Sequence, residues 1–332
     1  MSLLHPDRLF PAEPRTRDIA RALYSGIRDL PIISPHGHCD PQWFASDAPF
    51  SDPATLLIRP DHYLLRMLVS QGVSYEHLGV ASPGGAAETD TREVWRRFAR
   101  HYHLFRGTPS RLWMDYTFAH LFDLDTPLSA GTADFYYDRI AARLAQPAYR
   151  PRALFERFRI EMLATTEGAL DPLTHHAAIR GSGWTGNVVT TYRPDAVCDP
   201  DQDGFQDSLD RLADLTGCNL DTFDGFLEAH RQRRAHFRAH GAVATDHGVP
   251  DPTTADLPHT EAVELYSRIR ANAMAPGDAA LFRAQMLTEM ARMSLDDGFV
   301  LQVHPGAFRN HNTSLFNSHG RDKGADLPGA PE

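Results

Sequence analysis

The stretch PIISPHGHC, residues 31–39, joins a short apolar run to two histidines that one glycine separates. On an extended backbone, residues two apart point to the same side, so His36 and His38 can face one point in space. Neutral imidazole is the commonest metal ligand in proteins, and Gly37 lets the backbone bend between the two rings. The pattern predicts a divalent-metal site at the end of a strand. Two ordinary core or surface histidines, among the 18 of the chain, are the alternative.

Four more apolar runs follow, and each also ends in polar residues: 159–167, 186–195, 241–248 and 298–306. Helical patterns lie among them near 221–239, 261–273 and 278–294. Alternating strands and helices predict a parallel sheet with right-handed crossovers, and almost wholly apolar runs predict strands buried on both faces. Active sites of (β/α) barrels lie at the carboxyl ends of the strands. We therefore expect an α/β fold of the (β/α)8 TIM-barrel type.

The number of strands leaves this architecture open. Five strands are three short of a closed barrel, and nothing after Gly306 resembles another strand. We expect a barrel that is incomplete at the C-terminus, with a loop-like tail, and a chain that is inactive or unstable unless the missing strands are supplied. An open parallel sheet is the competing architecture, but its usual glycine-rich phosphate loop after the first strand is absent.

Three segments are expected. Residues 1–39 hold a helix over 15–29 and the first strand, residues 40–158 form a mostly helical insertion, and residues 159–332 hold strands two to five and the loop that follows. The helix over 15–29 is indicated by apolar residues at helical spacing.

The composition excludes several classes of protein. A net charge of -10 argues against nucleic acid as a partner. No apolar run approaches the ~20 residues that span a membrane, and the start of the chain lacks a signal-peptide pattern. Three cysteines without a CxxC pair argue against a disulfide framework, so a cytoplasmic location is expected. The only lysine, Lys323, ends no strand, which disfavours a pyridoxal phosphate Schiff base or a bridging carbamate.

Other polar residues at strand ends extend the candidate site. Asp246, His247 and His304 could add ligands, because a catalytic zinc usually takes about three from the protein. Arg193 offers a fork suited to a carboxylate, or it forms a structural ion pair with Asp195.

Three further candidates lie outside the strand ends. Tyr63 could donate a hydrogen bond or act as a general acid, although simple helix packing explains its spacing better. Arg309 and Asn310, in the loop after the fifth strand, suit a polyhydroxylated anionic substrate, or they belong to a solvated loop.

Several stretches together resemble the uronate isomerase (glucuronate isomerase) family of the amidohydrolase superfamily. They are LHPDRLFP, PIISPHGHCDP, DHYLLRMLVSQGV, RLWMDYTFAHLF, VVTTYRPDAV, ATDHG and LQVHPGAFRNHNTSLF. The resemblance implies the metal-dependent hydrolase fold, a distorted (β/α)8 barrel with a helical insertion after the first strand.

The resemblance also implies an activity and roles. The family interconverts D-glucuronate and D-fructuronate, and D-galacturonate and D-tagaturonate, without a nicotinamide or flavin cofactor. His36 and His38 match the metal-binding histidines, for which a loosely bound divalent ion, Zn²⁺, is expected. Tyr63 and His304 match active-site residues. From side-chain chemistry rather than from the resemblance, the expected substrate-binding residues are Arg193, Asp246, His247, Arg309 and Asn310. The family's Asp-x-Arg after its last strand has no counterpart here, and association between copies of the chain stays open.

Two other functions remain open at this point. A mononuclear metal-dependent hydrolase of the same superfamily would share the two histidines of the first strand. A sugar-acid-binding protein without catalysis would bind a uronate but leave its C2 proton unexchanged.

Overall fold

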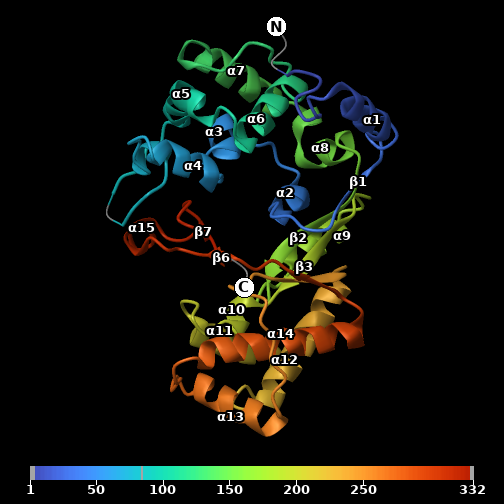
Figure 1. Ribbon diagram of the computed structural model, residues 1–332, viewed down its shortest axis with the longest axis vertical. Coiled ribbons are helices and arrows are strands. Elements are labelled where there is room, and N and C mark those ends of the chain that lie inside the picture. Colours follow the sequence, from blue (N-terminus) through green and yellow to red (C-terminus); the bar gives the residue numbers. More distant parts are fainter. Residues whose placement is uncertain (1–3, 84, 330–332) are drawn as a thin grey trace. The chain divides into compact units, whose positions relative to one another are not determined.

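A curled parallel sheet of five strands carries the candidate site. The computed structural model describes residues 4–83 and 85–329, and within them the strand order of this sheet is β1-β2-β3-β4-β5. The strands are β1 (Ile32–Ser34), β2 (Ile160–Gly168), β3 (Val188–Arg193), β4 (Ala244–His247) and β5 (Val300–Val303) (Figure 1). Each predicted apolar run therefore contains one strand, and the α/β fold with a parallel half-barrel is confirmed.

The register brings the polar strand ends together. Glu167 and Gly168 at the end of β2 pair with Tyr192 and Arg193 at the end of β3. On the other side of the sheet, Asp246 and His247 of β4 pair with Gln302 and Val303 of β5. Because all strands are parallel, their carboxyl ends meet at one edge of the curled sheet.

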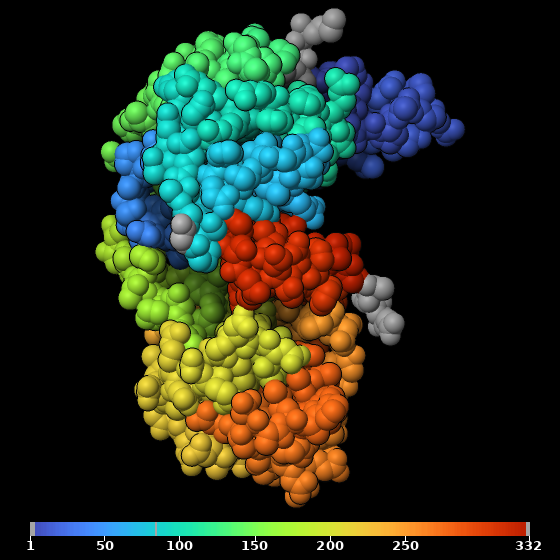
Figure 2. Space-filling model, turned by 90° about the vertical axis from the view of Figure 1, so that its left-hand side faces the viewer, coloured from blue at the N-terminus to red at the C-terminus, as the bar shows by residue number. Residues whose placement is uncertain are grey.

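Helices cover one face of this sheet and form its core. They are α2 (Pro41–Ser46), α9 (Thr174–Gly181), α10 (Asp195–Cys198), α11 (Phe205–Thr216), α12 (Phe223–Ala239), α13 (His259–Arg270) and α14 (Asp278–Asp297). Helices α12, α13 and α14 confirm the three predicted helical stretches. Their core includes Leu209, Phe226, Tyr266 and Met290, each no more than 1% exposed. In the space-filling view the yellow and orange helices α11 to α14 form one closely packed body (Figure 2).

A second compact unit is almost wholly helical. It comprises the chain up to Pro31, Ala48–Arg159 and Phe308–Leu327, whereas the sheet unit comprises Ile32–Asp47, Ile160–Ala307 and the chain from Pro328. Its helices are α1 (Pro14–Ser25), α3 (Pro53–Leu57), α4 (His62–Val69), α5 (Thr91–His101), α6 (Pro109–His120), α7 (Ala133–Leu144) and α8 (Pro151–Arg157), with short 3-10 turns at Glu76–Leu78, Tyr102–Phe105, Ala130–Thr132 and Pro147–Tyr149. The three predicted segments stay a prediction.

Aromatic side chains hold the helical unit together. Trp95 has no solvent exposure, and its indole N–H donates to the carbonyl oxygen of Ala133 at 2.9 Å. Phe98 and Phe118 pack against the same ring, with centroids 5.6 and 6.1 Å away. Buried aromatic rings of this kind supply much of the apolar area that a helical core needs.

The tail after Gly306 is more ordered than the sequence suggested. It holds β6 (Ala307–Phe308), α15 (Thr313–His319) and β7 (Leu327–Pro328), and β6 and β7 pair in a sheet of their own. The prediction of a loop-like tail was wrong, because the tail holds a helix and two short strands. Asn312 starts α15 by accepting a hydrogen bond from the Leu315 amide at 3.0 Å. Asparagine is favoured both at helix N-caps and in turns, so it did not distinguish the two.

No helix in the described part of the chain is long and apolar enough to cross a membrane.

A buried ion pair between α12 and α14 yields the first prediction. Arg234, 1% exposed, contacts Asp297 at 2.6 Å and also donates to Ser294 at 3.0 Å. Arg234→Met would leave the Asp297 carboxylate, which is 23% exposed, without its ionic partner and with the Phe299 amide as a remaining donor. We expect the free energy of unfolding to fall by about 3 kcal/mol in urea denaturation.

The control is Arg28→Met, which removes an ion pair at the surface. The contact of Arg28 with Asp29 is 3.1 Å, and the side chains are 61% and 67% exposed. Its loss should cost less than about 1 kcal/mol. Equal losses in the two variants would contradict the importance of the buried pair.

Candidate active site at the strand ends

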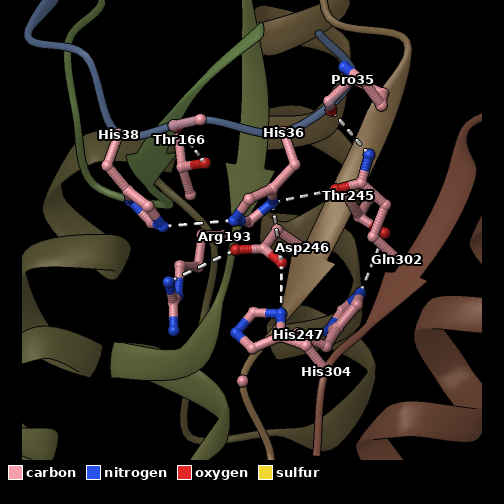
Figure 3. A network of polar contacts seen from close by, with 12 residues as sticks. Pro35, His36, His38, Thr166, Arg193, Thr245, Asp246, His247, Gln302 and His304 are labelled. Atoms are coloured by element: carbon pink, nitrogen blue, oxygen red, sulfur yellow. Dashed lines mark hydrogen bonds and ion pairs between the residues drawn. The ribbon is translucent and has the colours of Figure 1, made fainter. Parts of the chain in front are cut away.

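Polar side chains from four strand ends converge on one small region (Figure 3). His36 and His38 follow β1, Arg193 ends β3, Asp246 lies on β4 and His304 follows β5. Five of the residues predicted from sequence are therefore neighbours. All five belong to the sheet unit.

The two histidines of the first strand face each other. Their Nε2 atoms are 3.2 Å apart, and their rings meet edge to face. Gly37 permits this arrangement for a reason that the sequence did not show. A Cβ atom at Gly37 would lie 3.0 Å from the carbonyl oxygen of Ala164, so an alanine there would force that backbone to shift by a few tenths of an ångström. Thr166 also donates to the carbonyl oxygen of Gly37 at 3.0 Å, which ties this turn to β2.

Asp246 is the centre of charge in the region. Its side chain has no solvent exposure, and its oxygens lie 2.8 Å from Nδ1 of His304, 3.3 Å from a guanidinium nitrogen of Arg193 and 3.7 Å from Nδ1 of His36. Burial alone would raise the pKa of Asp246, but the contact with His304 and the charge of Arg193 outweigh it and hold that pKa below its usual value. Asp246 is therefore a carboxylate near neutral pH.

Arg193 is held from two sides. Its Nε lies 2.7 Å from Asp195, and the Asp195 carboxylate also accepts from the backbone N–H of Gly248 at 3.2 Å. A Cβ atom at Gly248 would lie 2.4 Å from the Arg193 guanidinium, so a larger residue would displace that fork. The ion pair with Asp195 thus exists, and it orients Arg193 beside Asp246.

His247 lies on the other face of the sheet. Successive residues of a strand point to opposite sides, so His247 turns away when Asp246 faces the histidines. Its ring is 4% exposed, contacts Thr245 at 2.9 Å and lines a cavity together with Met286 and Met290 of α14. Burial lowers the pKa of His247 to about 4. Sequence position groups His247 with Asp246 for substrate binding, but the structure places the two side chains on opposite faces of the sheet.

Three predicted residues belong to the helical unit. Tyr63 lies in the first turn of α4, where Asp61 caps the helix by accepting from the Tyr63 and Leu64 amides at 2.9 and 3.1 Å. Asp326 lies 3.7 Å from the Arg309 guanidinium and accepts from the Asn310 amide at 2.8 Å. The roles expected for Tyr63, Arg309 and Asn310 stay predictions.

The histidine pair fits two positions of a metal centre. Two nitrogens that each lie ~2.0–2.1 Å from a tetrahedral zinc are about 3.3 Å apart, close to the observed 3.2 Å. Among the described residues, neither oxygen of Asp246 receives a hydrogen bond of good geometry, although both are buried. Residues 4–83 and 85–329 hold no group of three His, Cys, Asp or Glu side chains with the spacing of a metal centre. They therefore supply two ligand positions and a nearby carboxylate.

Sequence reasoning missed Gln302 of β5. Its Oε1 lies 3.2 Å from Nδ1 of His36, and its Nε2 donates to the carbonyl oxygen of Pro35 at 2.9 Å. The signal was available, because Gln302 precedes His304 by two residues and shares its side of the strand. It was overlooked because glutamine carries no charge.

Known proteins resemble this chain over nearly its whole length. The sequence profile described as glucuronate isomerase matches residues 14–331. A uronate isomerase from Mesorhizobium japonicum is 60% identical over 329 residues, which are 99% of this chain and 70% of that protein.

This chain belongs to the glucuronate isomerase family.

Solved structures of the family show the same fold. The crystal structure of glucuronate isomerase from Caulobacter crescentus has a TM-score of 0.97 at 55% identity, covering 100% of this chain and 70% of that one. The uronate isomerase from Thermotoga maritima has a TM-score of 0.89 at 26% identity, covering 98% of this chain and 70% of that one. The expected C-terminal truncation is not supported, because these matches cover nearly all of this chain.

A second polar cluster lies on the helix-covered face of the sheet. Glu167 accepts hydrogen bonds from Thr165 at 2.9 Å and from Thr190, and His176 of α9 lies 3.7 Å away. Burial, only partly offset by the two threonine hydroxyls, raises the pKa of Glu167 to about 7. Burial also lowers the pKa of His176 to about 4, so both groups favour their neutral forms.

Replacing Gly37 tests the close approach behind the histidine pair. Gly37→Ala must move the turn away from Ala164, and we expect a loss of about 1–3 kcal/mol in the free energy of unfolding. Gly168→Ala is the control, because a Cβ atom there would meet nothing within 4 Å. A melting temperature that falls equally in both variants would show that the contact at Gly37 is unimportant.

The buried carboxyl of Glu167 gives stability a pH dependence. Its pKa of about 7 exceeds the ordinary 4.5, so the unfolded chain loses this proton first and stability falls as pH rises from about 4.5 to 7. Glu167→Gln removes that loss. Relative to the parent chain, the variant should gain about 1–3 kcal/mol above pH 7 and little at pH 4.5.

Urea denaturation at several pH values measures this difference. The control is Glu161→Gln, an exposed carboxyl on the same strand β2, which should change stability by less than about 0.5 kcal/mol at every pH. A pH-independent difference for Glu167→Gln would contradict the raised pKa.

Proposed function

We propose that this chain interconverts D-glucuronate and D-fructuronate, and D-galacturonate and D-tagaturonate. The observation that carries the proposal is membership of the glucuronate isomerase family together with the cluster of His304, Asp246 and Arg193 at the strand ends. The reaction moves a proton between C2 and C1 of the open-chain sugar acid. A base takes the C2 proton while O1 gains one, which gives a cis-enediol. Loss of the O2 proton and return of a proton to C1 then give the ketose.

His304 is the proposed proton-transfer group. Asp246 lies 2.8 Å from its Nδ1, which leaves Nε2 as the nitrogen free to take or give a proton. The side chain is 39% exposed, so a substrate can reach it. The carboxylate also stabilises the imidazolium that forms when the ring takes up a proton.

Arg193 is proposed to bind the substrate, and the histidine pair is proposed to bind a metal ion. The Arg193 fork suits the carboxylate of a uronate or a developing oxyanion. The amidohydrolase superfamily commonly binds a divalent metal, and we propose that His36 and His38 hold it, with Zn²⁺ favoured by two imidazole ligands. When bound, such an ion would polarise a substrate oxygen. Tyr63, Arg309 and Asn310 remain proposed contributors to proton transfer and substrate binding.

The setting of the reaction is also part of the proposal. Cys39, Cys198 and Cys218 form no disulfide, which supports a reducing compartment such as the cytoplasm. The proposed partner is a small uronate rather than a nucleic acid or a membrane.

Incubation with D-glucuronate in heavy water tests the function. We expect D-fructuronate as the product, with deuterium entering the sugar at C1. His304→Asn should lower kcat by about 10²–10⁴-fold, because it removes the proposed proton-transfer group. His175→Asn is the matched control, an exposed histidine of the same unit that lies on α9.

The outcomes separate the alternatives. Binding of uronate by the wild-type chain without deuterium incorporation would favour the sugar-acid-binding protein, and cleavage of lactones or esters would favour the hydrolase. Normal turnover by His304→Asn would contradict the role of His304 without contradicting the isomerase.

A further inference from the structure

Gln302 contacts the end of the first strand from the far side of the curled sheet. It lies on β5, and β1 and β5 are the outermost strands in the order β1-β2-β3-β4-β5. Even so, its amide reaches both Pro35 and His36, as the dashed lines in Figure 3 show. One neutral side chain thus joins the two outermost strands at the edge where the candidate site lies.

The orientation of this amide follows from its partners. The carbonyl oxygen of Pro35 can only accept a hydrogen bond, so the Gln302 NH₂ group must face it, at 2.9 Å. The amide oxygen Oε1 then faces Nδ1 of His36, at 3.2 Å. The other neighbour of this Nδ1 is an oxygen of Asp246, 3.7 Å away. Both groups around Nδ1 are therefore acceptors.

We propose that Gln302 is a positioning residue that keeps the proton of neutral His36 on Nδ1 and so presents the Nε2 lone pair toward His38. A neutral imidazole carries one proton, and the acceptor oxygen beside Nδ1 decides which nitrogen bears it. Nε2 then becomes the ligand atom, 3.2 Å from Nε2 of His38. Metal-binding histidines depend on such partners of the other ring nitrogen.

The tautomer does not depend on the isomerase reaction, whereas its consequence for metal affinity rests on the proposed metal site.

Two variants separate orientation of the His36 ring from simple bracing of the strands. Gln302→Leu loses both the acceptor for His36 and the donor for Pro35. Gln302→Glu keeps an acceptor oxygen toward His36 but loses the donor. A merely structural bridge would fail equally in both variants.

Nitrogen NMR of the ¹⁵N-histidine-labelled chain at pH 8 reads the tautomer directly, with the His36 signals assigned by their loss in His36→Asn. We expect Nδ1 protonated and Nε2 unprotonated in the wild-type chain and in Gln302→Glu, and a mixture in Gln302→Leu. Wild-type His36 protonated on Nε2 would overturn the proposal, as would a Gln302→Leu spectrum with unchanged His36 signals. The wild-type measurement decides the question even if a variant fails to fold.

Titration with Zn²⁺ alone, followed by calorimetry, is the second readout. We expect Gln302→Leu to weaken zinc binding by about 10–100-fold and Gln302→Glu to bind as tightly as the wild type or more tightly. Thr245→Val is the control, because Thr245 is a fully buried strand-end residue whose hydroxyl contacts His247 instead. Equal weakening in both Gln302 variants would assign the residue to bracing alone and overturn the proposal. Zinc binding in neither the wild type nor the variants would count against the metal site in the proposed function and leave the tautomer result standing.

Discussion

Asp246 keeps its negative charge at a position with no solvent exposure, and the geometry of the strand ends follows from that requirement. An isolated carboxylate in such a place would cost far more free energy than the fold can supply, so cationic and polar partners must surround it. Those partners are His304 and Arg193, with His36 slightly farther away. They come from three different strand ends, so only a parallel sheet with this register brings them to one carboxylate.

The alternation of side chains along each strand then divides the polar residues into two networks. On β4, Asp246 joins the charged cluster, while His247 turns toward the helices. On β2, Thr166 anchors the turn at Gly37, while Glu167 joins the neutral cluster with His176. One face of the sheet therefore concentrates charge, and the other keeps its titratable groups neutral under the helices. The same sequence run supplies both because a one-residue step reverses the direction of the side chain.

Much of this arrangement follows from the sequence, and the exceptions have physical causes. Apolar runs with polar ends form a strong pattern, which predicted all five strands of the curled sheet and the neighbourhood of Asp246. The prediction that every strand is buried on both faces was wrong for β1 and β5, which contain no buried residue because they are outermost in the sheet. The apolar pattern does not show which side of the strand each residue faces, however, so it could not tell whether Asp246 or His247 faces the site. Gly37 and Gln302 owe their importance to contacts with residues more than 120 positions away. Such contacts leave no local signature in the sequence.

The partners of His36 and His304 suit the two rings to different tasks. In both, an oxygen faces Nδ1 and leaves Nε2 available, but the nearest acceptor differs. For His36 it is the neutral amide of Gln302 at 3.2 Å, with Asp246 farther away at 3.7 Å, whereas for His304 it is the carboxylate of Asp246 at 2.8 Å. An amide orients the ring without favouring a positive charge on it, which suits a ligand that must stay neutral. A carboxylate also stabilises the imidazolium, which suits a group that takes up a proton. The proposed division between ligation by His36 and proton transfer by His304 thus follows from the difference between one amide and one carboxylate.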